Sequence, residues 1–254
     1  MIPLVSPTEY IEMDRPHMDW LVKGLIPRPG FIFLTGEPKS GKSFLALQLA
    51  LCIVQGESFL GHSVGYPYNN KDNIPVSPSH TNPAVLYLQL DTSELVWRDR
   101  LAGLRDQGVD LLGSLLMPHP DSIPGRLNVL EKGTRDWLQA VITAANPALV
   151  IVDVLRQIHN ADEDSSTEMK AVFDELTLLF QGRSVLMLHH APKLHPELGP
   201  VRVVNTLRGS SYMAGYTDAI WLLNDGYLHI ESRFSDPQRL WLQRRKCGFF
   251  DRRR

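Results

Sequence analysis

The sequence predicts an α/β fold in which helices cover both faces of a mostly parallel, doubly wound sheet. Short apolar runs typical of strands alternate along the chain with longer segments of helical periodicity. The runs at residues 31–35, 84–90, 148–153 and 184–188 are mostly apolar, as expected for strands buried on both faces. A glycine-containing loop stands between the first run and a helix-forming segment.

That loop has the spacing G-x-x-x-x-G-K-S. It consists of Gly36, Glu37, Pro38, Lys39, Ser40, Gly41, Lys42 and Ser43. In this P-loop pattern, backbone N–H groups turn inward around phosphate oxygens, and the helix N-terminus adds partial positive charge. We expect Lys42 to reach the β- and γ-phosphates, Ser43 to bind Mg²⁺, and Phe44 to complete the segment. A chance match is the alternative, although such matches rarely have a strand before them and a helix after them.

Composition limits the class of protein. The 254 residues allow one large α/β domain or two small ones. Because the net charge is −2, any nucleic-acid contact must come from a local patch. Two cysteines fit a reducing compartment without a disulfide framework, so we expect a cytoplasmic protein. We also expect no signal peptide and no membrane span.

The chain is expected to divide into an N-terminal arm at residues 1–20 and one core domain at residues 21–254. The arm carries three prolines with mixed polarity, which predicts irregular structure or a disordered tail. Residues 21–30 are expected to form a turn-rich lead into the P-loop strand.

The helix that begins at Lys42 should run to about Gln55, because Gly56 follows. Proline and asparagine then predict a long loop over residues 61–83. After the strand at 84–90, Ser93 is a plausible N-cap for a helix over residues 94–107.

A short strand is predicted at residues 115–117 and a helix at 134–145, where Pro147 follows. Ser165 and Glu168 have the spacing of a capping box that opens a helix over residues 167–181. The remaining predicted elements are a short helix at 210–215, a strand at 218–223, and a C-terminal β-hairpin formed by 227–233 and 240–245.

Polar side chains follow the other apolar strands. Asp153 ends the third strand in the Walker B pattern and could hold Mg²⁺, or it could simply cap a loop. Asp91 follows the second strand and could orient the attacking water, or cap the next helix. His189 and His190 end the fourth strand, and one of them could sense the γ-phosphate, with metal binding or loop polarity as alternatives. Because ligands bind at the carboxyl ends of parallel strands, we expect these groups to converge.

The order of motifs resembles that of the RecA-like ATPases, and most closely the RepA group of plasmid and phage hexameric helicases. The matching segments are the P-loop, Tyr-Leu-Gln-Leu-Asp, Leu-Val-Ile-Val-Asp, Leu-His-His-Ala-Pro-Lys and Arg-Gly-Ser-Ser. The resemblance covers residues 20–245. It implies a RecA-like P-loop NTPase fold with bound ATP and Mg²⁺.

The resemblance also implies roles for single residues. Asp91 occupies the position of the catalytic carboxylate, where the family usually has Glu, and Glu94 is the fallback. His190 matches the γ-phosphate sensor. Arg208 resembles an arginine finger that reaches a neighbouring subunit's nucleotide, although a surface arginine is the alternative.

The resemblance implies a ring, with a hexamer expected, that translocates on single-stranded DNA in replication or repair. Residues 191–207 correspond to the DNA-contacting loop, in which Lys193 and Arg202 are the firm cations. This low charge, and the presence of Asp91 where the family usually has Glu, leave a second function open. The protein could be a regulatory or loader ATPase that controls a protein partner. A kinase with a small acceptor fits the motifs poorly.

Overall fold

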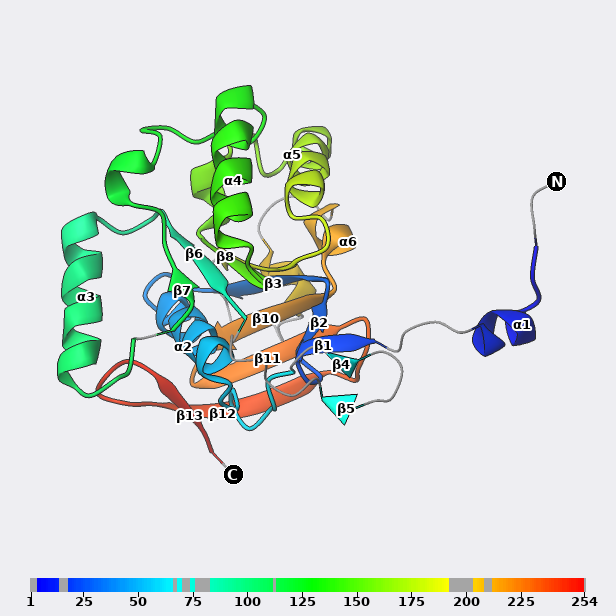
Figure 1. The fold of residues 1–254 in the computed structure, drawn as a ribbon, viewed down its shortest axis with the longest axis horizontal. Coiled ribbons are helices and arrows are strands. Elements are labelled where there is room, and N and C mark those ends of the chain that lie inside the picture. The colour runs from blue at the N-terminus through cyan, green and yellow to red at the C-terminus, as the bar shows by residue number, and fades with distance from the viewer. Residues whose placement is uncertain are drawn as a thin grey trace.

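The computed structural model describes most of the chain (Figure 1). The described residues are 4–13, 18–65, 68–69, 74–75, 83–111, 113–191, 203–207 and 212–253. Arg208 and residues 192–202 lie outside them.

A large mixed sheet forms the centre of the fold, with strands in the order β13-β12-β11-β10-β3-β9-β8-β6-β7. From β10 to β7 all neighbours are parallel, whereas β10 to β13 pair antiparallel. The predicted mostly parallel α/β fold is therefore confirmed. The bounds are β3 Gly30–Gly36, β6 Val85–Gln89, β7 Leu115–Leu116, β8 Leu149–Asp153, β9 Ser184–His190, β10 Ala219–Asn224, β11 Tyr227–Ser232, β12 Gln238–Arg244 and β13 Phe250–Arg252.

Helices cover both faces of this sheet (Figure 1). Helices α2 (Lys42–Gln55) and α3 (Glu94–Asp106) pack into one apolar cluster. Helices α4 (Lys132–Ala145), α5 (Ser166–Leu179) and α6 (Tyr212–Tyr216) pack into the other. Successive strand residues alternate between the clusters, which is the pattern of a doubly wound sheet.

Local signals set the helix ends. Gly56 takes a left-handed conformation after α2, and its N–H bonds to the Cys52 and Ile53 carbonyls. The predicted capping box of α5 is half formed. The Ser165 side chain accepts from the Glu168 N–H, but the Glu168 carboxylate accepts from the Asp162 N–H instead.

Ser93 occupies the N-cap position of α3 as predicted, but its side chain makes no capping hydrogen bond. The predicted short helix near residues 210–215 is observed as α6 at Tyr212–Tyr216. Short 3₁₀ helices that the sequence did not predict lie at Pro120–Ser122, Leu155–Ile158 and Val203–Thr206.

Several small strands were not predicted from the sequence. The lead into the P-loop forms a hairpin of β1 (Asp19–Val22) and β2 (Ile26–Arg28), too short and too interrupted by glycine and proline to give a clear period. The predicted loop at 61–83 contains the antiparallel pair β4 (Tyr68–Asn69) and β5 (Ile74–Pro75). The predicted irregular arm contains helix α1 (Pro7–Glu12), and its division from a core at residue 21 stays a prediction.

The predicted C-terminal hairpin is present as β11 and β12, and it is part of a larger antiparallel unit. Asp225 and Gly226, both with positive φ, turn β10 into β11, and β13 adds a further strand. Within the described residues, every helix is too short or too polar to cross a lipid bilayer.

Replacing Phe173 with alanine should destabilise the fold strongly. Its fully buried ring contacts the rings of Phe31, Phe33 and Tyr216, with centroids 5.9, 6.0 and 5.2 Å away. The cavity left behind predicts a loss of about 3–5 kcal/mol, measured by urea unfolding. Leu178→Ala on the same helix, where the side chain is 69% exposed, should change stability by less than about 0.5 kcal/mol. Equal losses in the two variants would contradict the assigned core.

Candidate nucleotide-binding site

The P-loop connects the end of β3 to the start of α2. Lys39 and Gly41 have φ angles of 66° and 104°, which lie in the left-handed region and turn the backbone inward. A Cβ atom at Gly41 would stand 2.8 Å from the Phe250 ring. One at Gly36 would stand 2.6 Å from the Leu223 carbonyl oxygen. Both glycines are therefore required by close packing, and the loop lies at the N-terminus of α2, where the helix dipole favours an anion.

The Lys42 side chain is buried inside this loop. Its Nζ donates to the carbonyl oxygens of Gly36 at 2.8 Å and Glu37 at 2.9 Å. Burial lowers the pKa of Lys42 to about 8, while the charges of Asp153, Asp91 and Glu37 oppose this shift. The ammonium group is thus held in the loop by groups that a phosphate can replace.

Asp153 and Ser43, the two predicted metal ligands, lie in contact. The Asp153 carboxylate accepts hydrogen bonds from the Ser43 hydroxyl and from the Tyr87 hydroxyl, the latter at 2.8 Å. Burial raises the pKa of Asp153, and these two hydrogen bonds oppose the rise. One carboxylate and one hydroxyl beside a phosphate site are hard oxygen donors of the kind that Mg²⁺ prefers, so the residues fit that ion.

Two candidates for the catalytic carboxylate differ in their surroundings. Asp91 follows β6 and accepts weakly from the Gln157 amide at 3.4 Å. Its charge influences the pKa values of both Lys42 and Asp153. Glu94 instead forms an ion pair with Arg98 at 3.6 Å. The geometry therefore favours Asp91, which remains exposed at the edge of the site.

The two histidines at the end of β9 face opposite sides of the sheet. His189 is buried and meets the Phe33 ring edge-on, with centroids 6.2 Å apart, on the side that α5 covers. His190 pairs in register with Gly36, and alternation from Leu188 turns it to the α2 side. The structure therefore brings His190, and not His189, to the P-loop face. No group of three potential metal-ligating side chains is found among the described residues.

Sequence reasoning missed the surroundings of Phe44. Two guanidinium groups lie over its half-buried ring, Arg100 at 4.7 Å and Arg244 at 5.0 Å from the ring centroid. Arg100 also lies over Trp97 at 5.2 Å, and its charge influences the pKa of Asp153. The only sequence signal for these contacts was the position of Phe44 directly after the G-K-S triplet.

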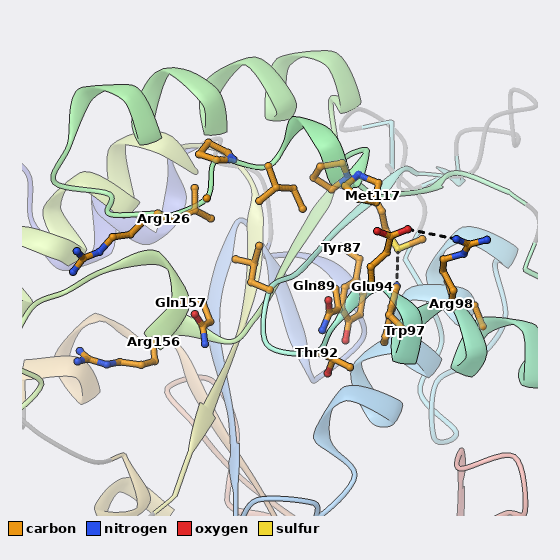
Figure 2. Close-up of a pocket in the computed structure, with 18 of the residues that line it drawn as sticks. Tyr87, Gln89, Thr92, Glu94, Trp97, Arg98, Met117, Arg126, Arg156 and Gln157 are labelled. Carbon is orange, nitrogen blue, oxygen red and sulfur yellow. Dashed lines mark hydrogen bonds and ion pairs between the residues drawn. The ribbon is translucent and has the colours of Figure 1, made fainter.

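A cavity of about 790 Å³ lies beside the site, between α3 and residues 117–127. Figure 2 shows Trp97 and Arg98 at one end of it and Arg126 and Arg156 at the other. Tyr87 also lines this cavity while its hydroxyl bonds to Asp153, so the cavity wall and the predicted metal ligand share one side chain.

Comparison with known proteins agrees with this arrangement. The structure is similar to the crystal structure of the KaiC-like protein PH0186 from the hyperthermophilic archaeon Pyrococcus horikoshii OT3. The TM-score is 0.57 at 10% sequence identity, and the alignment covers 94% of this chain and 100% of that chain. At this identity the likeness concerns the fold, which is RecA-like. A search of curated proteins finds no match.

The sequence matches a family model described as AAA domain over residues 4–195. That match spans well over half of the chain and includes the P-loop, Asp91, Asp153 and His190. The protein therefore belongs to the AAA domain family and is a RecA-fold P-loop ATPase.

Proposed function

We propose that this ATPase is a ring-forming helicase or translocase that moves on single-stranded DNA in replication or repair. The observation that carries the proposal is the anchoring of residues 191–207 at both ends on the P-loop strand. The Ala191 N–H donates to the Gly36 carbonyl at 3.0 Å. The Thr35 hydroxyl donates to the Thr206 carbonyl at 3.2 Å. A segment tied in this way can follow changes in the P-loop.

The chain's own groups account for hydrolysis. Lys42 leaves the Gly36 and Glu37 carbonyls and neutralises charge on the β- and γ-phosphates. Asp91 orients a water whose oxygen attacks the γ-phosphorus, and accepts its proton. The bond to the β–γ bridging oxygen breaks, which yields ADP and inorganic phosphate. Ser43 and Asp153 would hold Mg²⁺, which would supply further positive charge at the phosphate oxygens.

Coupling to DNA follows from the shared Gly36 carbonyl. In the structure this oxygen accepts from both Lys42 Nζ and the Ala191 N–H. When Lys42 turns to a phosphate, the Gly36 carbonyl keeps only the Ala191 bond. His190, one residue earlier, forms a hydrogen bond to the γ-phosphate and loses it after hydrolysis. The first change acts at Ala191, the first residue of the proposed DNA-contacting segment, and the second acts at the residue just before it.

Assembly completes the site. By the resemblance, Arg208 extends from each subunit to the nucleotide of its neighbour, which requires a head-to-tail interface. A hexameric ring is the closed arrangement that we propose.

One observation favours a second function, a regulatory or loader ATPase that acts on a protein partner. The positive charge for DNA is low: residues 191–207 hold Lys193 and Arg202 as their firm cations, and Arg245 near the C-terminus pairs with Asp251. In that case hydrolysis would be slow and independent of DNA.

Lys42→Ala should lower ATP turnover by about 10²–10³-fold, because a preorganised cation at the transferred phosphate is lost. Phosphate release measured at saturating ATP tests this. Lys132→Ala, which removes an exposed lysine paired with Asp136 on α4, is the control and should keep wild-type turnover. Normal ATP turnover in Lys42→Ala would contradict the assignment of the nucleotide-binding site.

Mixing two inactive variants tests the shared site. Arg208→Ala should lower turnover by about 10³-fold or more. In mixed rings, a subunit with intact Lys42 meets a neighbour with intact Arg208, so Lys42→Ala and Arg208→Ala together should regain activity.

Mass measurement with and without MgATP and an oligonucleotide checks assembly in parallel. The translocase proposal requires a nucleotide-dependent oligomer and faster hydrolysis with single-stranded DNA. Hydrolysis unaffected by the oligonucleotide favours the regulatory ATPase.

Nucleotide affinity should depend on pH through Lys42. In the free protein its pKa is about 8, and bound phosphate raises that pKa, so binding takes up a proton above pH 8. ADP affinity should be level from pH 7 to 8 and then fall by up to about tenfold per pH unit. Titration calorimetry from pH 7 to 9.5 measures this. Lys42→Arg, which stays protonated, should lack the decline, and an equal decline in both would contradict the assignment.

A further inference from the structure

One face of the P-loop helix is covered by the C-terminal end of the chain. Gly41, Phe44 and Gln48 follow the i, i+3, i+7 spacing that places them on one side of α2. All three contact the segment 244–250, which runs from the end of β12 into β13. Figure 1 shows β13 beside α2.

Gln48 completes the open edge of β13. Its Nε2 donates to the Phe250 carbonyl at 2.8 Å, and its Oε1 accepts from the Phe250 N–H at 2.8 Å. On the other side β13 pairs with β12, where Phe250 is opposite Arg244. The side-chain amide therefore supplies the donor and acceptor that a neighbouring strand would supply.

The contacts nearer the P-loop are tight. The Phe250 ring, in a side chain that is 5% exposed, lies against Gly41 so closely that a Cβ there would stand 2.8 Å from it. A Cβ on Gly248 would stand 2.5 Å from the Phe44 ring. Close packing of this kind transmits small displacements, because neither backbone can move toward the other. The first turn of α2 thus cannot shift toward segment 244–250 without moving that segment.

We propose that Gln48 and Phe250 are positioning residues for the nucleotide site, which act by holding the first turn of α2 and the P-loop N–H groups in their phosphate-binding arrangement. The inference rests on the proposed role of the P-loop in binding ATP. Neither residue touches the nucleotide. Their contribution is to pre-organise the loop, so losing it weakens ground-state and transition-state binding together.

Gln48→Leu removes both hydrogen bonds at nearly constant volume. The Kd for ADP and the KM for ATP should both rise about tenfold, while kcat stays within about twofold. Gln55→Leu is the matched control: the same residue type on the same helix, whose amide donates to the Asp110 carbonyl at 2.7 Å at the far end from the P-loop. It should leave all three constants at wild-type values. A rise of the same size in both variants, or in neither, would overturn the proposal.

A second variant guards against simple unfolding. Phe250→Leu keeps the backbone bonds to Gln48 and removes the ring that packs on Gly41, so it should raise the Kd for ADP severalfold. Thermal unfolding without nucleotide is measured for every variant. If Gln48→Leu and Phe250→Leu lose affinity only in proportion to the fraction unfolded, the proposal fails.

The same measurements separate this proposal from the proposed function. If wild-type protein bound no ADP and hydrolysed no ATP, the function itself would be wrong. If wild-type protein did both while Gln48→Leu matched Gln55→Leu, only the positioning role would be wrong.

Discussion

A buried ammonium group is the constraint on which the site depends. Lys42 is 5% exposed, and removing a charge from water costs several kcal/mol unless nearby groups offset it. The Gly36 and Glu37 carbonyls and the charges of Asp153 and Asp91 provide that compensation. The loop must therefore curl tightly enough to present two carbonyls to one side chain. Its left-handed residues and its close packing against neighbouring strands follow from that requirement.

The Gly36 carbonyl links this constraint to the rest of the sheet. It accepts from Lys42 on one side and from Ala191 on the other, at the point where β3 and β9 end together. Strand pairing in register brings His190 to the same level, and β8 brings Asp153 to the same face two strands away. Parallel strands thus convert residues far apart in sequence into one cluster, because their carboxyl ends share an edge.

The sequence was enough to predict this edge, because each part has a local signature. A buried parallel strand has a short, mostly apolar sequence, and the polar residue that follows indicates where the strand ends. Tyr87 shows the limit of prediction from sequence. A tyrosine inside an apolar run is expected to be a core residue, and only the structure shows that its hydroxyl bonds to Asp153. Contacts made across the fold carry no local signal at all. Gln48 and Phe250 are 202 residues apart in the sequence. A single glutamine on an apolar helix gives no indication of which distant residue it will bond to.

In the proposed motor, DNA binding depends on assembly, because each subunit alone carries few positive charges for DNA. One subunit brings two firm cations, Lys193 and Arg202, to the segment proposed to contact DNA. Each neutralised phosphate on a single strand contributes a salt-dependence slope of about −0.7, so one copy alone would bind weakly at physiological salt. A ring of six copies would present about twelve such cations along one strand, and their contributions combine through high effective concentration. In the proposed ring, the same interface would bring Arg208 to the neighbour's nucleotide. On this proposal, a subunit that cannot assemble would lack both its full DNA-binding surface and part of its catalytic site, so ATP, DNA and neighbouring subunits should bind cooperatively.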